Sequence, residues 1–202
     1  MKLYYSPGAC SLAPHIVLHE SGLPFEAVLA STKTKQLADG TDYLTINSLG
    51  YVPFLVLADG RTLHEGPVIS QYIADQVPAT GLVPAAGSWE RYKVMEWLTF
   101  IGTELHKGFS PLFNPATPAE YKTIATDKLM QRLQWVDSQL AGKQYLMGDQ
   151  FNVADGYLFT VTNWTQPTKL DISGLAHLAA YRERVGARPA VQAAMKAEGL
   201  LK

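Results

Sequence analysis

A stretch rich in proline, glycine and small residues at positions 77–88 separates two parts of the chain with different hydrophobic patterns. In the first part, short apolar runs of strand length alternate with helical segments, whereas from Trp89 onward the pattern is helical throughout. Alternating strands and helices build a layered sheet domain, and continuous helical periodicity builds a bundle. The sequence therefore predicts an α/β domain at residues 1–78, a linker at 79–88 and an all-α domain at 89–202.

The first part reads as strand, helix, strand, loop, hairpin and helix. Strands are expected at residues 3–5, 25–29, 54–57 and 62–64, and helices from Ser11 to Gly22 and from Pro67 onward. Asp59-Gly60 between the last two strands is the pair most typical of a tight β-hairpin. This order of elements is that of an α/β sandwich of about eighty residues.

The second part contains several helix signals. A helix is expected at 89–107, where only Gly102 lowers the propensity. Thr117 to Glu120 reads as a capping box with Pro118 at the first helical position. Residues 152–155 form a second start of this kind, and Arg188-Pro189 opens the last helix.

The charge balance argues against two classes of partner. Seventeen Lys and Arg residues oppose eighteen Asp and Glu residues, which leaves a net charge of −1. Binding to nucleic acid or to an anionic membrane depends on a basic face that releases counterions, so we expect no nucleic acid and no membrane among the partners. The apolar runs are too short for a spanning helix, and Pro7-Gly8 interrupts the N-terminus where a signal peptide would continue. We therefore expect a cytoplasmic protein.

Cys10 is the only cysteine of the chain, which excludes an internal disulfide framework. It stands at the mouth of a predicted helix, where unpaired N–H groups and the helix dipole favour a thiolate. Free cysteines are also among the most buried residues, so position alone leaves a reactive and a packed Cys10 equally open. Ala13 occupies the place of the second cysteine of a C-x-x-C motif. A reactive Cys10 therefore needs an external thiol, which points to a low-molecular-weight thiol as co-substrate.

Two short motifs suit a peptide ligand. Val52-Pro53 is an ordinary strand start, or it forms a cis peptide that turns the backbone of Val52 toward an extended peptide. Glu65-Gly66 precedes the helix that begins at Pro67. A carboxylate there is favourable with the helix dipole alone, but the same amides also form an anion site and Glu65 could bind an ammonium group. These amides and Glu65 together suit an amino-acid head group, with its carboxylate on the backbone and its amine on Glu65.

Further polar residues lie in the helical part. Thr99, Thr103 and His106 share one face of the helix at 89–107, with Lys107 beside them. Such a face normally meets water, and it could equally face the first domain.

We expect no metal site. His15 and His19 have the i, i+4 spacing of metal ligands, but no third ligand or general base accompanies them.

The motifs of the chain resemble those of bacterial beta-class glutathione S-transferases along essentially its whole length. The matching segments are residues 1–12, Tyr51-Val52-Pro53, Glu65-Gly66, Gln71 to Asp75, and Glu104-Leu105-His106-Lys107. The resemblance implies a glutathione transferase fold, with a thioredoxin-like N-terminal domain that contains a cis-Pro53 and a C-terminal helical bundle domain. It also implies a homodimer and glutathione as co-substrate, without a metal.

The resemblance also implies a set of site residues. Glutathione would lie along Cys10, Lys35, Val52, Pro53, Glu65 and Gly66, and the helical domain would contribute Thr99, Thr103, Glu104, Leu105 and His106. Cys10 would hold the glutathione sulfur, either as a hydrogen-bond partner of its thiolate or as a mixed disulfide. The positive groups of His106 and Lys107 would tune the charge at that sulfur, and Lys35 would meet the glycyl carboxylate. Tyr5 stands where other classes use a tyrosine and is secondary. Similar proteins often carry Asn in place of Thr99, and Ser or Thr in place of Asn152.

The predicted activity is attack of the glutathione thiolate on an electrophilic, hydrophobic compound, as in detoxification or the degradation of aromatic compounds. The second substrate would lie against Phe109, Phe113 and Trp164. Two alternatives remain open: glutathione-dependent thiol–disulfide exchange or peroxide reduction through Cys10, and non-catalytic binding of hydrophobic ligands.

Overall fold

The computed structural model of the protein describes residues 1–201 and divides the chain into two compact units. The first unit comprises Met1–Val83 and the C-terminal segment from Ala187 onward, and the second comprises Pro84–Gly186. The boundary at Val83 falls inside the predicted linker. The sequence analysis assigns all residues after 88 to one helical domain, whereas the structure groups the last helix with the first unit.

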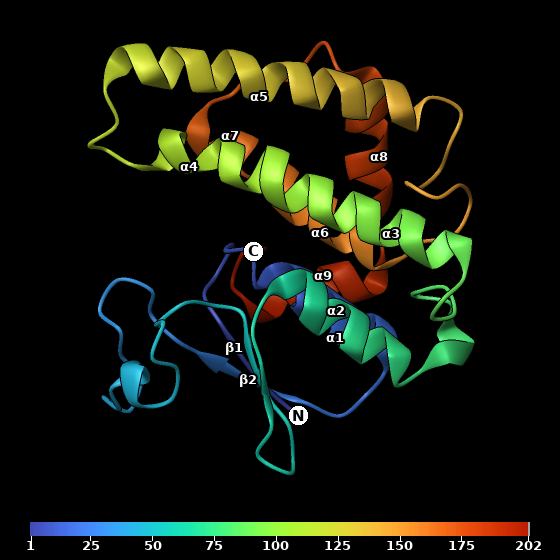
Figure 1. Ribbon diagram of the computed structural model, residues 1–202. Helices are drawn as coiled ribbons and strands as arrows, with labels where there is room; N and C mark the ends of the chain where they lie inside the picture. Colours follow the sequence, from blue (N-terminus) through green and yellow to red (C-terminus); the bar gives the residue numbers. More distant parts are fainter. Residues whose placement is uncertain (202) are drawn as a thin grey trace. The chain divides into compact units, whose positions relative to one another are not determined.

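The first unit contains a four-stranded mixed sheet in the order β2-β1-β3-β4; Figure 1 labels the neighbouring strands β1 and β2. The strands are β1 (Lys2–Tyr5), β2 (Glu26–Leu29), β3 (Phe54–Val56) and β4 (Thr62–Leu63). The central strand β1 pairs parallel with β2 and antiparallel with β3, and β3 and β4 form the predicted hairpin. Parallel β1 and β2 need a crossover connection, which the helix between them provides.

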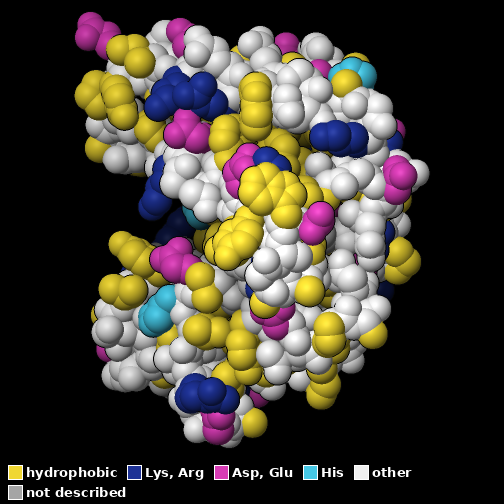
Figure 2. Space-filling model, turned by 45° about the vertical axis from the view of Figure 1, so that its right-hand side comes forward, with side chains coloured by type: hydrophobic (Ala, Val, Ile, Leu, Met, Phe, Trp, Pro, Cys, Tyr) yellow, Lys and Arg dark blue, Asp and Glu magenta, His cyan; other side chains and the backbone are white. Residues whose placement is uncertain are grey.

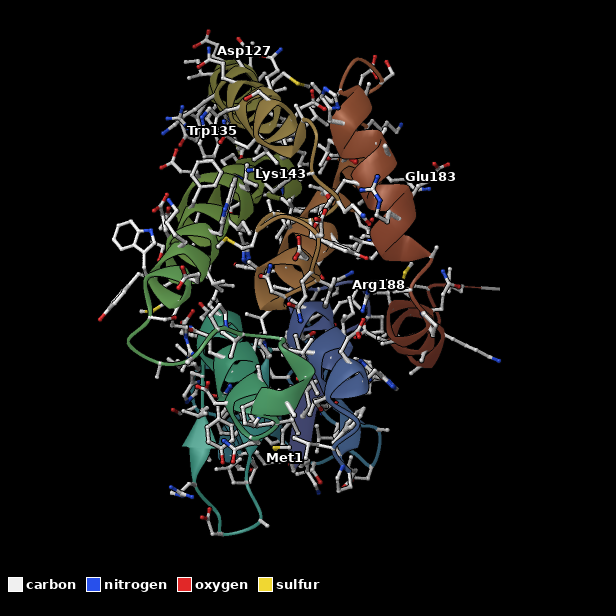
Figure 3. All side chains as sticks on the ribbon, turned by 90° about the vertical axis from the view of Figure 1, so that its right-hand side faces the viewer. Met1, Asp127, Trp135, Lys143, Glu183 and Arg188 are labelled. Atoms are coloured by element: carbon white, nitrogen blue, oxygen red, sulfur yellow. The ribbon has the colours of Figure 1, made fainter. Side chains whose placement is uncertain are left out.

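Three helices complete the first unit: α1 (Leu12–Ser21), α2 (Gly66–Asp75) and α9 (Pro189–Ala197). Two short 3₁₀ turns lie at Tyr43–Thr45 and Pro78–Thr80. Helix α9 packs against α1. Arg188 lies at the start of α9 (Figure 3). Its guanidinium binds both carboxylate oxygens of Glu20, at 2.6 and 3.0 Å. Hydrophobic periodicity indicates a helix but not its partner, and this long-range pairing therefore escaped the sequence analysis.

The second unit consists of helices. They are α3 (Trp89–Phe100), a π-helical segment (Ile101–His106), α4 (Lys107–Phe113), α5 (Ala119–Leu140), α6 (Val153–Thr162), α7 (Thr165–Thr168) and α8 (Ala176–Gly186). Every residue of α6 is buried. In the part of the chain that the structure covers, none of the helices has the length and apolar character that crossing a membrane requires.

Of the two helix caps predicted for the second unit, the one at residues 152–155 is present. Asn152 accepts a hydrogen bond from the Ala154 N–H, and Asp155 accepts one from the Asn152 N–H, each at 2.9 Å. The predicted capping box at Thr117 is wrong, because Pro118 is itself the N-cap of α5, with extended backbone, and no side chain caps the helix there.

Candidate functional site

A short loop at residues 6–11 connects β1 with α1 and carries Cys10. The Ser11 hydroxyl closes this loop, because it accepts from the Ser6 N–H at 3.1 Å and donates to the Ser6 carbonyl at 3.2 Å. The Ala9 N–H also donates to the Ser6 carbonyl, at 3.0 Å. The sequence therefore places the cysteine in an ordered turn, two residues before the helix begins.

The thiol of Cys10 is half-buried and donates a hydrogen bond to the Val52 carbonyl across 3.3 Å. Two influences act on it in opposite directions. A carbonyl acceptor stabilises the neutral thiol, whereas the nearby N-terminus of α1 stabilises a thiolate. Cys10 is thus a partly accessible thiol with a backbone partner, which differs from a cysteine packed in an apolar core.

The segment that receives this hydrogen bond also adjoins the start of α2. The Val52-Pro53 peptide bond is cis, as the family resemblance implies. A Cβ atom added to Gly66 would lie 3.5 Å from the Pro53 side chain, so the N-terminus of α2 packs directly on the proline. Cys10, Val52, Pro53 and Gly66 are therefore neighbours in space, although they come from three separate stretches of sequence.

Glu65 has an unusual backbone conformation, with φ 66° and ψ 111°. For a residue other than glycine this left-handed φ costs roughly 1–3 kcal/mol, and such residues cluster at ligand sites. The Glu65 carbonyl accepts from the Val68 and Ile69 N–H groups at 3.0 and 2.9 Å. Its side chain makes no capping bond to the helix and is exposed. The carboxylate is therefore available to a cationic group.

Lys35 is held in the loop that leads to Val52. Its ammonium group donates to the Gly50 carbonyl at 2.7 Å and lies 5.6 Å from the centre of the Tyr51 ring. The hydroxyl of Tyr43 donates to the Tyr51 carbonyl at 2.8 Å, which fixes the same loop. These contacts hold the positive charge of Lys35 beside Gly50 and Tyr51, the two residues that precede the cis Val52-Pro53 peptide.

Tyr5 lies at the end of β1, and its ring centre is 5.3 Å from that of His15. Burial raises the pKa of its hydroxyl, and the negative charge of Glu198 adds to this effect. Tyr5 is therefore a neutral hydroxyl at neutral pH.

In the second unit, the π-helical segment contains four of the predicted residues, 103–106, and Lys107 follows it. Single π-helical turns inside an α-helix are uncommon and frequent at functional sites. The Thr103 hydroxyl donates to the Thr99 carbonyl at 3.0 Å, and the Thr99 hydroxyl donates to the Met95 carbonyl at 2.8 Å. Both side chains are exposed and retain acceptor capacity.

His106 has a strongly altered pKa. Burial lowers the pKa to about 4, and the positive charge of Lys107 contributes in the same direction. Its Nδ1 lies 2.7 Å from the Tyr157 hydroxyl, and its ring contacts Trp164, with the centres 4.8 Å apart. The expectation that His106 adds positive charge is therefore corrected: the imidazole is neutral at neutral pH, and the positive charge at this position comes from Lys107.

Glu104 and Leu105 have structural contacts of their own. The Glu104 carboxylate accepts from the Arg132 Nε–H at 2.7 Å, and this hydrogen bond is the main cause of its lowered pKa. The Leu105 side chain is fully buried, so only its backbone could meet a ligand.

The three aromatic residues predicted for the second substrate form one cluster. The Trp164 ring centre lies 5.7 Å from both Phe109 and Phe113, and the two phenylalanines are 6.4 Å apart. Phe113 is half-exposed, whereas Phe109 is buried and belongs to the core. Because His106 also contacts Trp164, the cluster lies directly beside the π-helical segment.

Other features do not coincide with these residues. A pocket of about 440 Å³ in the second unit is lined by Phe159, Asn163, Ala179, Ala180, Arg182 and Glu183, none of them a predicted site residue. Within residues 1–201, no group of three or more His, Cys, Asp or Glu residues is arranged to hold a metal ion. His15 and His19 stack on each other with ring centres 5.2 Å apart.

The sequence analysis missed two features near these residues. The π-helical segment has no signal beyond Gly102 inside the helical pattern. The second is Glu198, whose carboxylate contacts His15 and the loop that carries Cys10. A possible signal for Glu198 was its position, because an acidic residue at a helix C-terminus is opposed by the helix dipole.

Comparisons with known proteins agree with this arrangement. Residues 8–76 match the family model of the glutathione S-transferase N-terminal domain, and residues 100–189 match that of the C-terminal domain. Glutathione S-transferase GstA of Escherichia coli O157:H7 is 50% identical over 200 residues, which cover 99% of this chain and 100% of the relative.

Solved structures give the same result. A sphingomonad glutathione S-transferase, complexed with glutathione, is 48% identical with a TM-score of 0.95, over 100% of both chains. A bacterial beta-class enzyme from Sphingomonas chungbukensis is 46% identical with a TM-score of 0.95, again over 100% of both chains.

The mixed sheet with its cis-proline, followed by a helical unit, defines a thioredoxin-like domain joined to a helical domain. The chain belongs to the glutathione S-transferase family, in its bacterial beta class, and is a transferase enzyme.

Proposed function

We propose that this protein conjugates the thiolate of glutathione to electrophilic, hydrophobic compounds. The observation that carries the proposal is the position of the Cys10 thiol, 3.3 Å from the Val52 carbonyl. The next residue, Pro53, packs on the N-terminus of α2. In the reaction, the glutathione thiol gives its proton to solvent, its sulfur forms a bond to the electrophilic carbon, and the leaving group departs with the electrons of the broken bond.

The residues of the first unit bind glutathione in this proposal. The backbone of Val52 pairs with the extended tripeptide, and the exposed carboxylate of Glu65 binds its ammonium group. Lys35 binds the glycyl carboxylate in place of the Gly50 carbonyl that it now contacts. The Cys10 thiol meets the glutathione sulfur and donates to its thiolate as it now donates to Val52.

The residues of the second unit act on the sulfur and on the electrophile. Lys107 supplies positive charge, and His106 acts as a neutral hydrogen-bond donor because its pKa is about 4. Thr99, Thr103 and the backbone at 104 and 105 have lesser roles as polar contacts. The aromatic cluster of Phe109, Phe113 and Trp164 suits a flat, apolar second substrate.

Glutathione-dependent thiol–disulfide exchange is the second candidate function. It is favoured by a single, partly accessible cysteine in an ordered loop at a helix mouth. The Cys10 thiolate would attack a disulfide, form a mixed disulfide and release one thiolate. Glutathione thiolate would then attack the mixed disulfide, form a new disulfide with the attached group and regenerate the Cys10 thiolate. Non-catalytic ligand binding is a third reading, which the aromatic cluster alone supports.

We also propose that the protein is a cytoplasmic homodimer. Its single cysteine suits a reducing compartment. Trp89, Tyr92 and Met95 are exposed at helical spacing along α3. Figure 2 shows that one face of the molecule carries large hydrophobic side chains at its surface. An exposed apolar stripe of this kind is typical of a contact surface, and we assign it to the second copy. Light scattering should give twice the monomer mass, and a monomer at micromolar concentration would refute this assignment.

The activity is tested by retention on immobilised glutathione and by turnover of a chloro-nitroaromatic compound with glutathione. We expect both retention and chloride release that depends on glutathione. A folded protein that shows neither would refute the proposed function.

A further inference from the structure

The C-terminal turn after α9 places a carboxylate in an unusual position. Gly199 has φ 70°, and the Leu200 N–H donates back to the Met195 carbonyl at 2.9 Å, which reverses the chain after the helix. Glu198, the C-cap residue, is thereby turned inward, and its side chain is completely buried. Neither the helix dipole nor burial favours an anion there, so its partners must explain its presence.

Both oxygens of the Glu198 carboxylate have buried partners. Oε1 lies 2.9 Å from His15 Nδ1, which donates to it from α1. Oε2 accepts from the Gly8 N–H at 2.9 Å. Gly8 lies two residues before Cys10, with φ 70°, and Leu200 lies 3.5 Å from the position that a Gly8 Cβ would occupy. The C-terminal turn therefore contacts the cysteine loop through a charge-assisted hydrogen bond and an apolar side chain.

This anchor is separate from the bonds that close the loop on itself. Ser6 and Ser11 hold the two ends of the loop together, whereas Gly8 is bound at its middle by a residue 190 positions away in the sequence. The position of the Cys10 sulfur against Val52 depends on where the loop as a whole is held.

We propose that Glu198 is a positioning residue for Cys10: through Gly8 and His15 it holds the cysteine loop against the Val52 carbonyl. The C-terminal segment therefore helps to position the Cys10 thiol, in addition to packing against α1. The inference deepens the proposed function, but thiol reactivity can be measured without glutathione, so either proposal can fail independently of the other.

The chain offers a matched control. The Arg188–Glu20 ion pair joins the same two helices, α9 and α1, by contacts of 2.6 and 3.0 Å. Neither residue contacts the cysteine loop through these bonds. Arg188→Gln therefore weakens the attachment of α9 and leaves the Gly8 anchor in place.

The test is the second-order rate of Cys10 alkylation by iodoacetamide in the native protein, for wild type, Glu198→Ala, Glu198→Gln and Arg188→Gln. Loss of the anchor frees the thiol from the carbonyl that favours its neutral form, so we expect Glu198→Ala to react at least about fivefold faster. Glutamine keeps an acceptor for the Gly8 N–H, so Glu198→Gln should stay within about twofold of wild type, as should Arg188→Gln.

Equal rates in wild type and a folded Glu198→Ala protein would overturn the proposal. So would the same acceleration in Arg188→Gln, because it would show a general loosening of α9. If Glu198→Ala does not fold, Glu198→Asp is judged by the same rates, since its shorter side chain cannot reach both partners.

Discussion

The Cys10 thiol and the Val52 carbonyl are hydrogen-bonded across 3.3 Å, and this bond joins the loop before α1 to the segment before β3. It places the chain's only thiol beside a backbone group suited to bind an extended peptide. In the absence of ligand the carbonyl favours the neutral thiol, which suits the donation of a hydrogen bond to a bound thiolate. The N-terminus of α1 favours the Cys10 thiolate that disulfide exchange requires.

Replacement of Cys10 by alanine should therefore separate the two candidate activities. Disulfide exchange needs the Cys10 sulfur and should fall to background in Cys10→Ala. Conjugation uses the glutathione sulfur and should lose less than about tenfold in kcat/KM. Steady-state assays with a chloro-nitroaromatic and with a mixed disulfide would measure both. Complete loss of conjugation in the folded variant would contradict this division of roles.

The strained backbone of Glu65 makes function and stability separable at this position. Glu65→Gly relieves an unfavourable φ of 66°, and we expect the free energy of unfolding to stay equal or to rise by up to about 2 kcal/mol. The same change removes the carboxylate, so the Kd for glutathione should rise roughly 10–100-fold, as expected for a lost charge-assisted hydrogen bond.

Calorimetric titration and urea denaturation would measure the two quantities, with Glu65→Gln as a control that keeps the strain. Unchanged glutathione affinity in both variants would remove Glu65 from the proposed site.

His106 should make stability depend on pH in the acidic range. Its folded pKa of about 4 lies below the roughly 6.5 of an unfolded histidine. Between these values the unfolded chain binds more protons, so the free energy of unfolding should fall as the pH falls from about 6.5 to about 4, by roughly 1–3 kcal/mol from this residue.

Urea denaturation at several pH values would show that the free energy of unfolding changes less steeply with pH in His106→Asn than in wild type. An identical slope would mean that the pKa of His106 is the same in the folded and the unfolded protein, which would contradict a folded pKa of about 4. Since His106 is already neutral above about pH 5, its own titration should not appear in the kcat/KM profile at neutral pH.

Asp155 should be one of the most sensitive positions for folding. Its buried carboxylate accepts from the backbone N–H groups of Leu146 and Asn152 at 2.9 Å, and from the Tyr181 hydroxyl at 3.1 Å. Asp155→Ala leaves these donors without this acceptor and should cost about 3–5 kcal/mol. Asn152→Ala removes one cap bond and should cost about 1 kcal/mol, whereas Asn152→Ser should be nearly neutral. Similar losses for all three variants in urea denaturation would contradict this account of the capping box.

Local sequence signals were sufficient for most of the fold. Alternation and turn residues indicate the four strands and α1 and α2, and the Asn152 box marks the start of α6 because its bonds are made within four residues. The errors lie where distant contacts or backbone detail decide. The unit to which α9 belongs depends on its packing against α1, and Pro118 becomes a cap because its own backbone is extended.

The site residues also divide into those that local motifs indicate and those that depend on distant contacts. The sheet topology brings Cys10, Val52 and Gly66 together, and the matching motifs had indicated them. The charge state of His106 depends on its burial and the pairing of Glu104 on Arg132, which lies 28 residues further along the chain. Neither property can be read from residue spacing, and the buried bond from Glu198 to Gly8 spans nearly the entire chain.

The central claim is that the first unit binds glutathione with its sulfur at Cys10, and intact-mass measurement after incubation with oxidised glutathione tests it most directly. Attack of the Cys10 sulfur on the disulfide releases one glutathione thiolate and leaves the other half on the protein. We predict an adduct of one glutathionyl group in the wild type, its absence in Cys10→Ala, and slower formation in Glu65→Ala. A wild-type protein that forms no adduct, or a Cys10→Ala protein that does, would contradict the account.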